Sequence, residues 1–371
     1  MLSIGWLVVV IVLCWWWLSS RVVPVHEDHA RLLPIDVRPE GVYRHSCVMS
    51  VNRPVDPAHA LPRYFKYKES VLVPVRNQGK CASCWAYAVS DVVADRLSLA
   101  TGGVVRENLS VQELLSCFRP EQFSCAVGGI PEMAYGYVSK HGLSTESAYP
   151  YQQKDGGAMA PCLVRDSLSL VDYLYDDPRR ADTHPDKVFV DPSTIRNLCV
   201  SPRWWVPHGD TLEANVWNMK TEIFLHGPIC GTLMVYDDLY DYDGSSVYKV
   251  RKGARFRGGH AIEIFGWSDG GANTIEKGFE GPYWICRNSW GFIWPRRLPK
   301  HSGWFYVRMG SNEASIEARA SSASPVLNHA QKAHRSRDWY SSAYLSYDDY
   351  ANDPERVNFF ADVQKRDSVK T

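Results

Sequence analysis

The clearest periodic pattern in this chain follows Ser83. Apolar residues recur there at helical spacing, at Trp85, Ala88, Val89, Val92, Val93 and Leu97. This spacing predicts an amphipathic helix with one face against a core. Ser83 is of a residue type that caps helices, so Cys84 would lie in the first turn. The positive end of the helix dipole favours a thiolate there, which is the nucleophilic form of cysteine.

The second half of the chain carries the pattern of strands. Ile262 and Ile264 alternate along one segment, and residues 304–307 form a short apolar run. We therefore expect an α+β fold. Its helical half would span about residues 75–165, and its strand-rich half, with a barrel-like sheet, about residues 166–324.

The composition excludes several classes of function. The chain has 371 residues, of which 45% are hydrophobic, and this is ample for a full-sized core. Its 41 basic and 41 acidic residues cancel, so no nucleic-acid partner is expected. The sequence contains neither a glycine-rich phosphate loop nor a zinc-type cluster of cysteine and histidine. We therefore expect no metal and no cofactor.

The N-terminal segment indicates the cellular targeting of the protein. Residues 4–18 form an uncharged apolar run that includes three consecutive tryptophans and precedes Arg21. The run is long for a signal-peptide core, short for a spanning helix, and rich in a residue that favours the membrane interface. We expect residues 1–21 to be an uncleaved signal anchor or, alternatively, a cleaved signal. Either one predicts the secretory pathway, with a membrane-anchored, lysosome- or endosome-like, or extracellular protein.

Three motifs resemble one known family, in the chain order of that family. Residues 78–85 read Gln-Gly-Lys-Cys-Ala-Ser-Cys-Trp and resemble the active-site segment of papain-like cysteine proteases. The segments around His260 and Asn288, Gly-Gly-His-Ala-Ile and Arg-Asn-Ser-Trp-Gly, resemble the family's histidine and asparagine strands. The resemblance covers residues 61–324. It implies a papain-like two-domain fold, with the active-site cleft between a helical and a barrel-like domain.

The resemblance also implies catalytic roles. Cys84 would be the nucleophile, His260 its general base, and Asn288 the residue that orients the imidazole. Trp290 would screen the bond between His260 and Asn288 from water. Gln78 and the Cys84 backbone N–H would stabilise the oxyanion.

The resemblance places four residues in substrate binding. Gly128, Gly129 and Trp290 are three of them. The fourth is Arg319, which aligns with the position that commonly forms the floor of a specificity pocket. An inward-pointing Arg319 would favour substrates with an acidic residue second before the cleaved bond, through a charge-assisted pair. The alternative is an arginine in solvent.

Ten cysteines are many for a cytosolic enzyme. The resemblance pairs four of them in two disulfides, Cys81 with Cys125 and Cys117 with Cys162. Two disulfides imply an oxidising compartment. Cys286 lies in an apolar strand and is expected to be a small buried residue, whereas a pairing of Cys199 with Cys230 stays open.

The segments on either side of the protease-like region have separate expectations. Residues 22–60 are expected to be a short propeptide. Within it, Cys47 either forms a removable disulfide with Cys84, as in the propeptide of cathepsin X, or is an unpaired linker cysteine. Residues 325–371 form a polar tail that is expected to be disordered, partner-binding or removable.

The resemblance leans towards the cathepsin B and X branch, whose extra loops block one end of the cleft. No residues are inserted between Gln78 and Cys81 as in cathepsin X, and no paired histidines resemble the occluding loop of cathepsin B. We therefore expect an endopeptidase acting on polypeptides, although an insertion at residues 166–215 could obstruct the cleft. The alternatives are an exopeptidase, a transpeptidase or ligase, and a non-catalytic binding protein. The sequence leaves the oligomeric state open.

Overall fold

The computed structural model of the chain describes residues 61–118, 125–164, 186–199, 209–270, 279, 281–295, 303–332 and 344–345. The predicted signal segment, the predicted propeptide and Cys47 lie outside the described residues. The helices are α2 (Cys84–Ala100), α3 (Val111–Cys117), α4 (Pro131–His141), α7 (Gly209–His226), α8 (Asp237–Tyr240) and α9 (His329–Lys332). Two short 3₁₀ helices span Pro192–Thr194 and Glu313–Ser315.

The strands form one large antiparallel sheet and one small pair. The large sheet contains β1 (Tyr64–Tyr67), β4 (Arg196–Asn197), β5 (Ile229–Tyr236), β6 (Phe256–Ser268), β7 (Tyr283–Arg287), β8 (Trp304–Arg308), β9 (Ala320–Ser322) and β10 (Tyr344–Leu345). The small pair joins β2 (Leu143–Ser144) to β3 (Lys187–Val188). The α+β class predicted from the sequence is confirmed.

The long strand β6 organises the large sheet. It pairs with β1, β5 and β7, in the order β10-β1-β6-β5-β9-β4, and β8 continues the sheet beyond β7. Among the described residues no pairing closes this sheet, so it is an open antiparallel sheet and not a closed barrel. Ile262 and Ile264 of β6 are buried in the core, as their alternation predicts.

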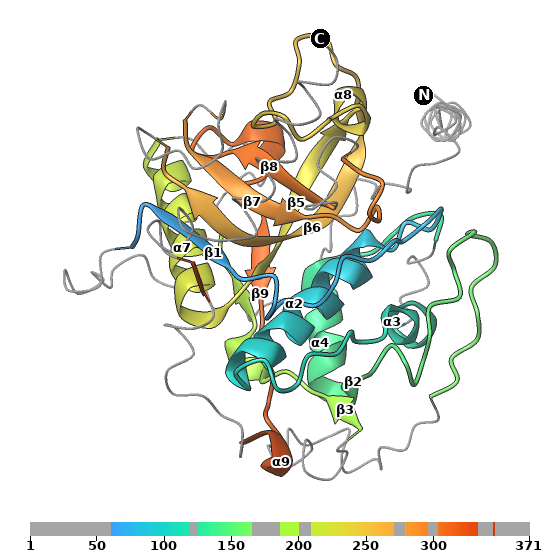
Figure 1. Cartoon of the computed structure of the whole chain (residues 1–371). Helices are drawn as coiled ribbons and strands as arrows, with labels where there is room; N and C mark the ends of the chain where they lie inside the picture. Colours follow the sequence, from blue (N-terminus) through green and yellow to red (C-terminus); the bar gives the residue numbers. More distant parts are fainter. Residues whose placement is uncertain are drawn as a thin grey trace, which may run out of the picture.

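Two hydrophobic cores divide the molecule. One lies around α2, α3 and α4, and the other lies between the sheet and α7, where Met219 and Ile223 pack with Phe265 and Trp267 of β6. In Figure 1, α2, α3 and α4 lie together below the sheet, whereas α7 lies beside it. Ala261 belongs to the helical core although it is a β6 residue, so the face of α2 meets the sheet directly.

Helix α2 begins at Cys84 as predicted, but it is not amphipathic. Its residues are buried from Cys84 to Leu99, because the sheet covers the face that α4 and α3 leave open. The charged side chains of α2 are paired; the guanidinium of Arg96, for example, donates to Glu222 of α7 at 2.9 Å. Ser83 is the N-cap residue by position, yet its side chain makes no capping hydrogen bond.

Both predicted disulfides are present, between Cys81 and Cys125 and between Cys117 and Cys162. The thiols of Cys199 and Cys230 are free and buried, so these two cysteines do not pair. Cys286 is also free and fully buried, as expected for a small residue inside the sheet.

Part of the predicted C-terminal tail, residues 325–371, belongs to the described structure. Residues 329–332 form α9, and β10 pairs with β1, placing Lys66 opposite Leu345. Most of residues 333–371 lie outside the described part of the chain. No helix within the described residues has the length and apolar character needed to cross a membrane.

Candidate active site

Cys84 is fully buried at the first position of α2. The helix starts here because the Ser83 carbonyl accepts the first helical bonds, from the N–H groups of Ala86 and Tyr87. The N–H groups at a helix start have no acceptor within the helix. Those of Cys84 and Trp85, together with the N–H of Ala261, are directed at the Cys84 sulfur.

His260 lies on β6 with its ring held from one side. Its Nε2 is 2.8 Å from Oδ1 of Asn288, and the same oxygen accepts the N–H of Ser289 at 2.8 Å. Because an amide oxygen only accepts, Nε2 carries the hydrogen in the neutral ring and Nδ1 is the basic nitrogen. Nδ1 is buried and has no hydrogen-bond partner among the described residues. The Trp290 ring covers the imidazole, with centroids 5.0 Å apart.

Cys84 and His260 come from elements that face each other. The Cys84 sulfur accepts the N–H of Ala261, the residue that directly follows His260, so the thiol lies beside this end of β6. Asn288 stands at the end of the neighbouring strand β7. The structure therefore brings together three of the residues that the sequence singled out, although they are spread over about two hundred positions.

Burial acts on both titratable groups of this site. It raises the pKa of the Cys84 thiol to about 12, although hydrogen bonds from backbone N–H groups lower it in part. It lowers the pKa of His260 to about 4, against the opposing effect of the bond to Asn288. Neither the Cys84 thiolate nor the His260 imidazolium is stable here alone. Transfer of the thiol proton to Nδ1 forms two charges at once, and each compensates the other, so the site can supply a thiolate as an ion pair.

Gln78 is fully buried and fixed through four of its atoms. Its backbone N–H donates to the Ser289 carbonyl at 2.8 Å, and its carbonyl accepts the Tyr151 hydroxyl at 2.8 Å. Its side-chain Oε1 accepts the Ser289 hydroxyl at 2.6 Å, while Nε2 donates to the Cys81 carbonyl at 2.8 Å.

The predicted substrate-binding glycines lie in the turn before α4. Gly129 packs on the Trp85 indole so closely that an added Cβ would lie 2.5 Å from the ring, and no side chain fits there. Gly128 has a φ of 88°, which favours glycine. This close contact ties the turn to the first residues of α2.

Arg319 is neither free in solvent nor available as an uncompensated cation. Its Nε and Nη2 donate to the two carboxylate oxygens of Glu132, both at 2.7 Å. The two side chains are 25% and 21% exposed. Glu132 lies in the first turn of α4, so the pair links the helical half to the segment that leads into β9.

Three residues of this region were not identified from the sequence. Ser289 directly follows Asn288 and could have been expected near it. Tyr151 and Glu132 carry no local signal of their contacts, because Gln78 and Arg319 reach them only in the folded chain.

Comparison with known proteins gives a consistent result. The model of the papain family of cysteine proteases matches residues 61–324. The chain is 34% identical to cathepsin B-like cysteine proteinase 5 of Caenorhabditis elegans over 267 residues, which cover 68% of this chain and 70% of the relative. It is 31% identical to cathepsin B-like cysteine proteinase 4 of the same organism over 260 residues, covering 66% and 68%. Among solved structures, proCathepsin B S9 from Trypanosoma congolense is similar in fold, with a TM-score of 0.51, 23% identity and coverage of 79% of this chain and 82% of that one.

Proposed function

This chain belongs to the papain family of cysteine proteases and is cathepsin B-like, and from that membership we propose that it cleaves peptide bonds through Cys84. The observation that carries the proposal is the buried imidazole of His260. Its Nε2 is fixed by Asn288, and its basic Nδ1 has no hydrogen-bond partner among the described residues. A nitrogen in that state, beside a free thiol, is suited to take the thiol proton.

The proposed reaction has two stages. His260 Nδ1 takes the proton of the Cys84 thiol, and the thiolate forms a bond to the carbonyl carbon of the substrate. The C–N bond then breaks as His260 returns the proton to the leaving amine. In the second stage His260 takes a proton from water, the hydroxide attacks the thioester carbonyl, and the C–S bond breaks. His260 returns its proton to the Cys84 sulfur, and the acid product releases its own proton to solvent as it becomes a carboxylate.

The oxyanion that forms at each stage needs donors that are already in place. Gln78 Nε2 and the Cys84 backbone N–H are the proposed donors, because the Cys84 N–H stands at the start of α2 and Gln78 Nε2 is held at the Cys81 carbonyl in the loop before it. Such donors, fixed before the reaction, are each worth roughly 3–4 kcal/mol in the best-studied protease.

We propose endopeptidase action. Internally quenched peptides blocked at both ends test it, with the same peptides carrying a free carboxyl terminus as the comparison. An endopeptidase cleaves both kinds at an internal bond. Cleavage that needs the free carboxyl terminus and removes only terminal residues would identify an exopeptidase instead.

The same assay separates hydrolysis from acyl transfer. With an added amine nucleophile, mass spectrometry of the products should find free carboxylates as the main species. A majority of amide products would identify a transpeptidase or ligase. A wild-type protein that cleaves no peptide and is not labelled by an epoxide thiol probe would identify a non-catalytic protein.

We also propose that the protein follows the secretory pathway. The two disulfides support an oxidising compartment. The apolar run at residues 4–18, which lies outside the described residues, supports entry into that route.

The ion pair at Arg319 predicts a change in substrate preference on mutation. If Arg319 forms the floor of the specificity pocket, Glu132 already compensates its charge, so an acidic substrate residue gains little there. The Glu132→Gln variant should raise the cleavage ratio of substrates with Glu, relative to Leu, second before the cleaved bond by about tenfold. The measurement is kcat/KM for the two peptides.

A matched double variant controls this prediction. Glu132→Gln combined with Arg319→Gln has no uncompensated cation, and its ratio should return to the wild-type value. An unchanged ratio in Glu132→Gln alone would show that Arg319 does not contact this substrate residue.

A further inference from the structure

We infer that Tyr151 is a positioning residue for the oxyanion donors, an inference that rests on the proposed function. Its hydroxyl contacts both segments that carry a proposed oxyanion donor, the loop with Gln78 and the start of α2 with Cys84. It donates to the Gln78 carbonyl at 2.8 Å, and it lies 2.9 Å from Oγ of Ser83, the residue before Cys84.

The directions of these two bonds follow from the number of hydrogens. A tyrosine hydroxyl has one hydrogen, and the bond to Gln78 uses it, since a carbonyl can only accept. Ser83 must therefore donate its own hydrogen to the Tyr151 oxygen. The Ser83 hydroxyl also lies 3.4 Å from the Cys81 carbonyl, a longer contact that involves the same hydrogen.

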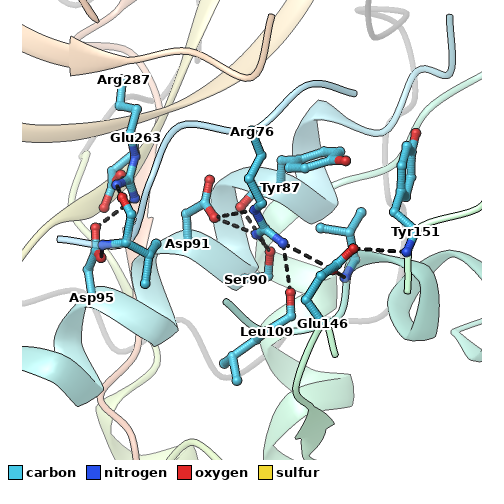
Figure 2. A network of polar contacts seen from close by, with 12 residues as sticks. Arg76, Tyr87, Ser90, Asp91, Asp95, Leu109, Glu146, Tyr151, Glu263 and Arg287 are labelled. Carbon is cyan, nitrogen blue, oxygen red and sulfur yellow. Dashed lines mark hydrogen bonds and ion pairs between the residues drawn. The ribbon is translucent and has the colours of Figure 1, made fainter. Parts of the chain in front are cut away.

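Tyr151 is itself held from α2 through a chain of charged groups (Figure 2). Its backbone N–H donates to Oε1 of Glu146 at 2.8 Å. Oε2 of Glu146 accepts from Nη1 of Arg76 at 3.2 Å, and Arg76 pairs with Asp91 and donates to Ser90 of α2. The backbone of Tyr151 is thereby anchored to the same helix that begins at Cys84.

The ring of Tyr151 is fixed as well. It packs edge-on against the ring of Tyr87, with centroids 5.3 Å apart. The Tyr87 hydroxyl donates to the carbonyl of Asn77, the residue before Gln78, at 3.2 Å. Two tyrosines of neighbouring segments therefore hold the consecutive carbonyls of Asn77 and Gln78 in the loop before α2.

Loss of the Tyr151 hydroxyl would act on both donors together. The Gln78 carbonyl would lose the Tyr151 hydroxyl as a donor, and the Ser83 hydroxyl would keep only its 3.4 Å contact with the Cys81 carbonyl, while the ring would still fill its place. Oxyanion stabilisation depends on donors within 2.7–3.1 Å of the developing charge. A loosened donor therefore weakens the transition state and leaves ground-state binding of the substrate nearly unchanged.

The test compares Tyr151→Phe with Tyr149→Phe. Tyr149 is a neighbouring tyrosine whose buried hydroxyl also makes two hydrogen bonds, to the Pro161 carbonyl and from the Leu163 N–H, and neither involves the proposed site. For Tyr151→Phe we expect kcat to fall about tenfold, because one oxyanion donor is partly lost. KM should stay within about twofold of the wild-type value. A peptide aldehyde, whose thiol adduct carries its oxygen in the oxyanion position, should bind about tenfold more weakly. Tyr149→Phe should change neither quantity.

Alkylation by iodoacetamide separates positioning from a general effect. It consumes the Cys84 thiolate without forming an oxyanion, so its rate should be the same in Tyr151→Phe and wild type. Unchanged kcat and aldehyde affinity in Tyr151→Phe would overturn the inference, and so would an alkylation rate that falls as far as kcat. A wild-type protein without peptidase activity would instead overturn the proposed function itself.

Discussion

Replacement of Cys84 by alanine is expected to lower kcat for peptide hydrolysis by about 10⁴-fold or more, the scale on which removal of a protease nucleophile acts. The reason is specific to the sulfur. His260 Nδ1 would have no thiol proton to take at the start of α2. The backbone of α2 needs nothing from the side chain, since its first bonds go to the Ser83 carbonyl.

The measurement is kcat/KM on a blocked peptide together with labelling by an epoxide thiol probe. Wild type should incorporate one label, and Cys84→Ala should incorporate none. Cys286→Ala provides the matched control, because Cys286 is an equally buried free thiol that lies inside the sheet on β7. It should retain both turnover and labelling. Turnover by Cys84→Ala at the wild-type rate would exclude Cys84 as the nucleophile.

The parts of this site that the sequence predicts are those with local signals. The helix that starts at Cys84 follows from the apolar period after Trp85, and the strand around His260 follows from the alternation of Ile262 and Ile264. The motifs that surround these residues put them in the order of a known family. Each of these signals spans a few neighbouring positions.

The parts that the sequence does not predict depend on contacts between distant positions. Helix α2 has polar residues on its second face, which in isolation indicate solvent. Their partners arise from tertiary packing: Asp95 pairs with Arg287, 192 positions away, and Arg96 with Glu222, 126 positions away. Arg319 similarly finds Glu132 at a separation of 187 positions. No local pattern specifies such pairs. Because of them, the polar face of α2 is buried and the charge of Arg319 is compensated, although the sequence alone indicates an exposed face and allows a free arginine.

One of these buried pairs is part of a triad that contains two acids and one base. Arg287 of β7 donates to Asp95 of α2 at 2.6 Å and also pairs with Glu263 of β6 (Figure 2). All three side chains are almost completely buried. Burial raises the pKa of both carboxyl groups, although Arg287 lowers both in part. Both carboxyl groups are therefore biased towards their protonated forms.

Replacement of Arg287 by methionine should therefore destabilise the fold by about 3–5 kcal/mol at neutral pH, the cost of leaving a buried charge without its partner. Methionine fills a similar volume but provides no cation. The Val73 carbonyl, which accepts from Arg287 at 2.5 Å, would lose that donor as well. Denaturant unfolding of the disulfide-intact protein measures the effect. Arg255→Met is the control, because its pair with Asp237 is at the surface, where Arg255 is 74% exposed, and no measurable change is expected.

The loss in Arg287→Met should depend on pH with a definite sign. The folded state holds carboxyl protons that the unfolded chain releases above about pH 4, so the free energy of unfolding falls as pH rises through that range. Without Arg287 the pKa values of Asp95 and Glu263 rise further, so the free energy of unfolding falls more steeply as pH rises. Destabilisation should be smaller at pH 5 than at pH 7, because protonation of both acids removes the uncompensated charge. An equal loss at the two pH values would show that packing of the Arg287 side chain, and not its charge, stabilises the contact between α2 and the sheet.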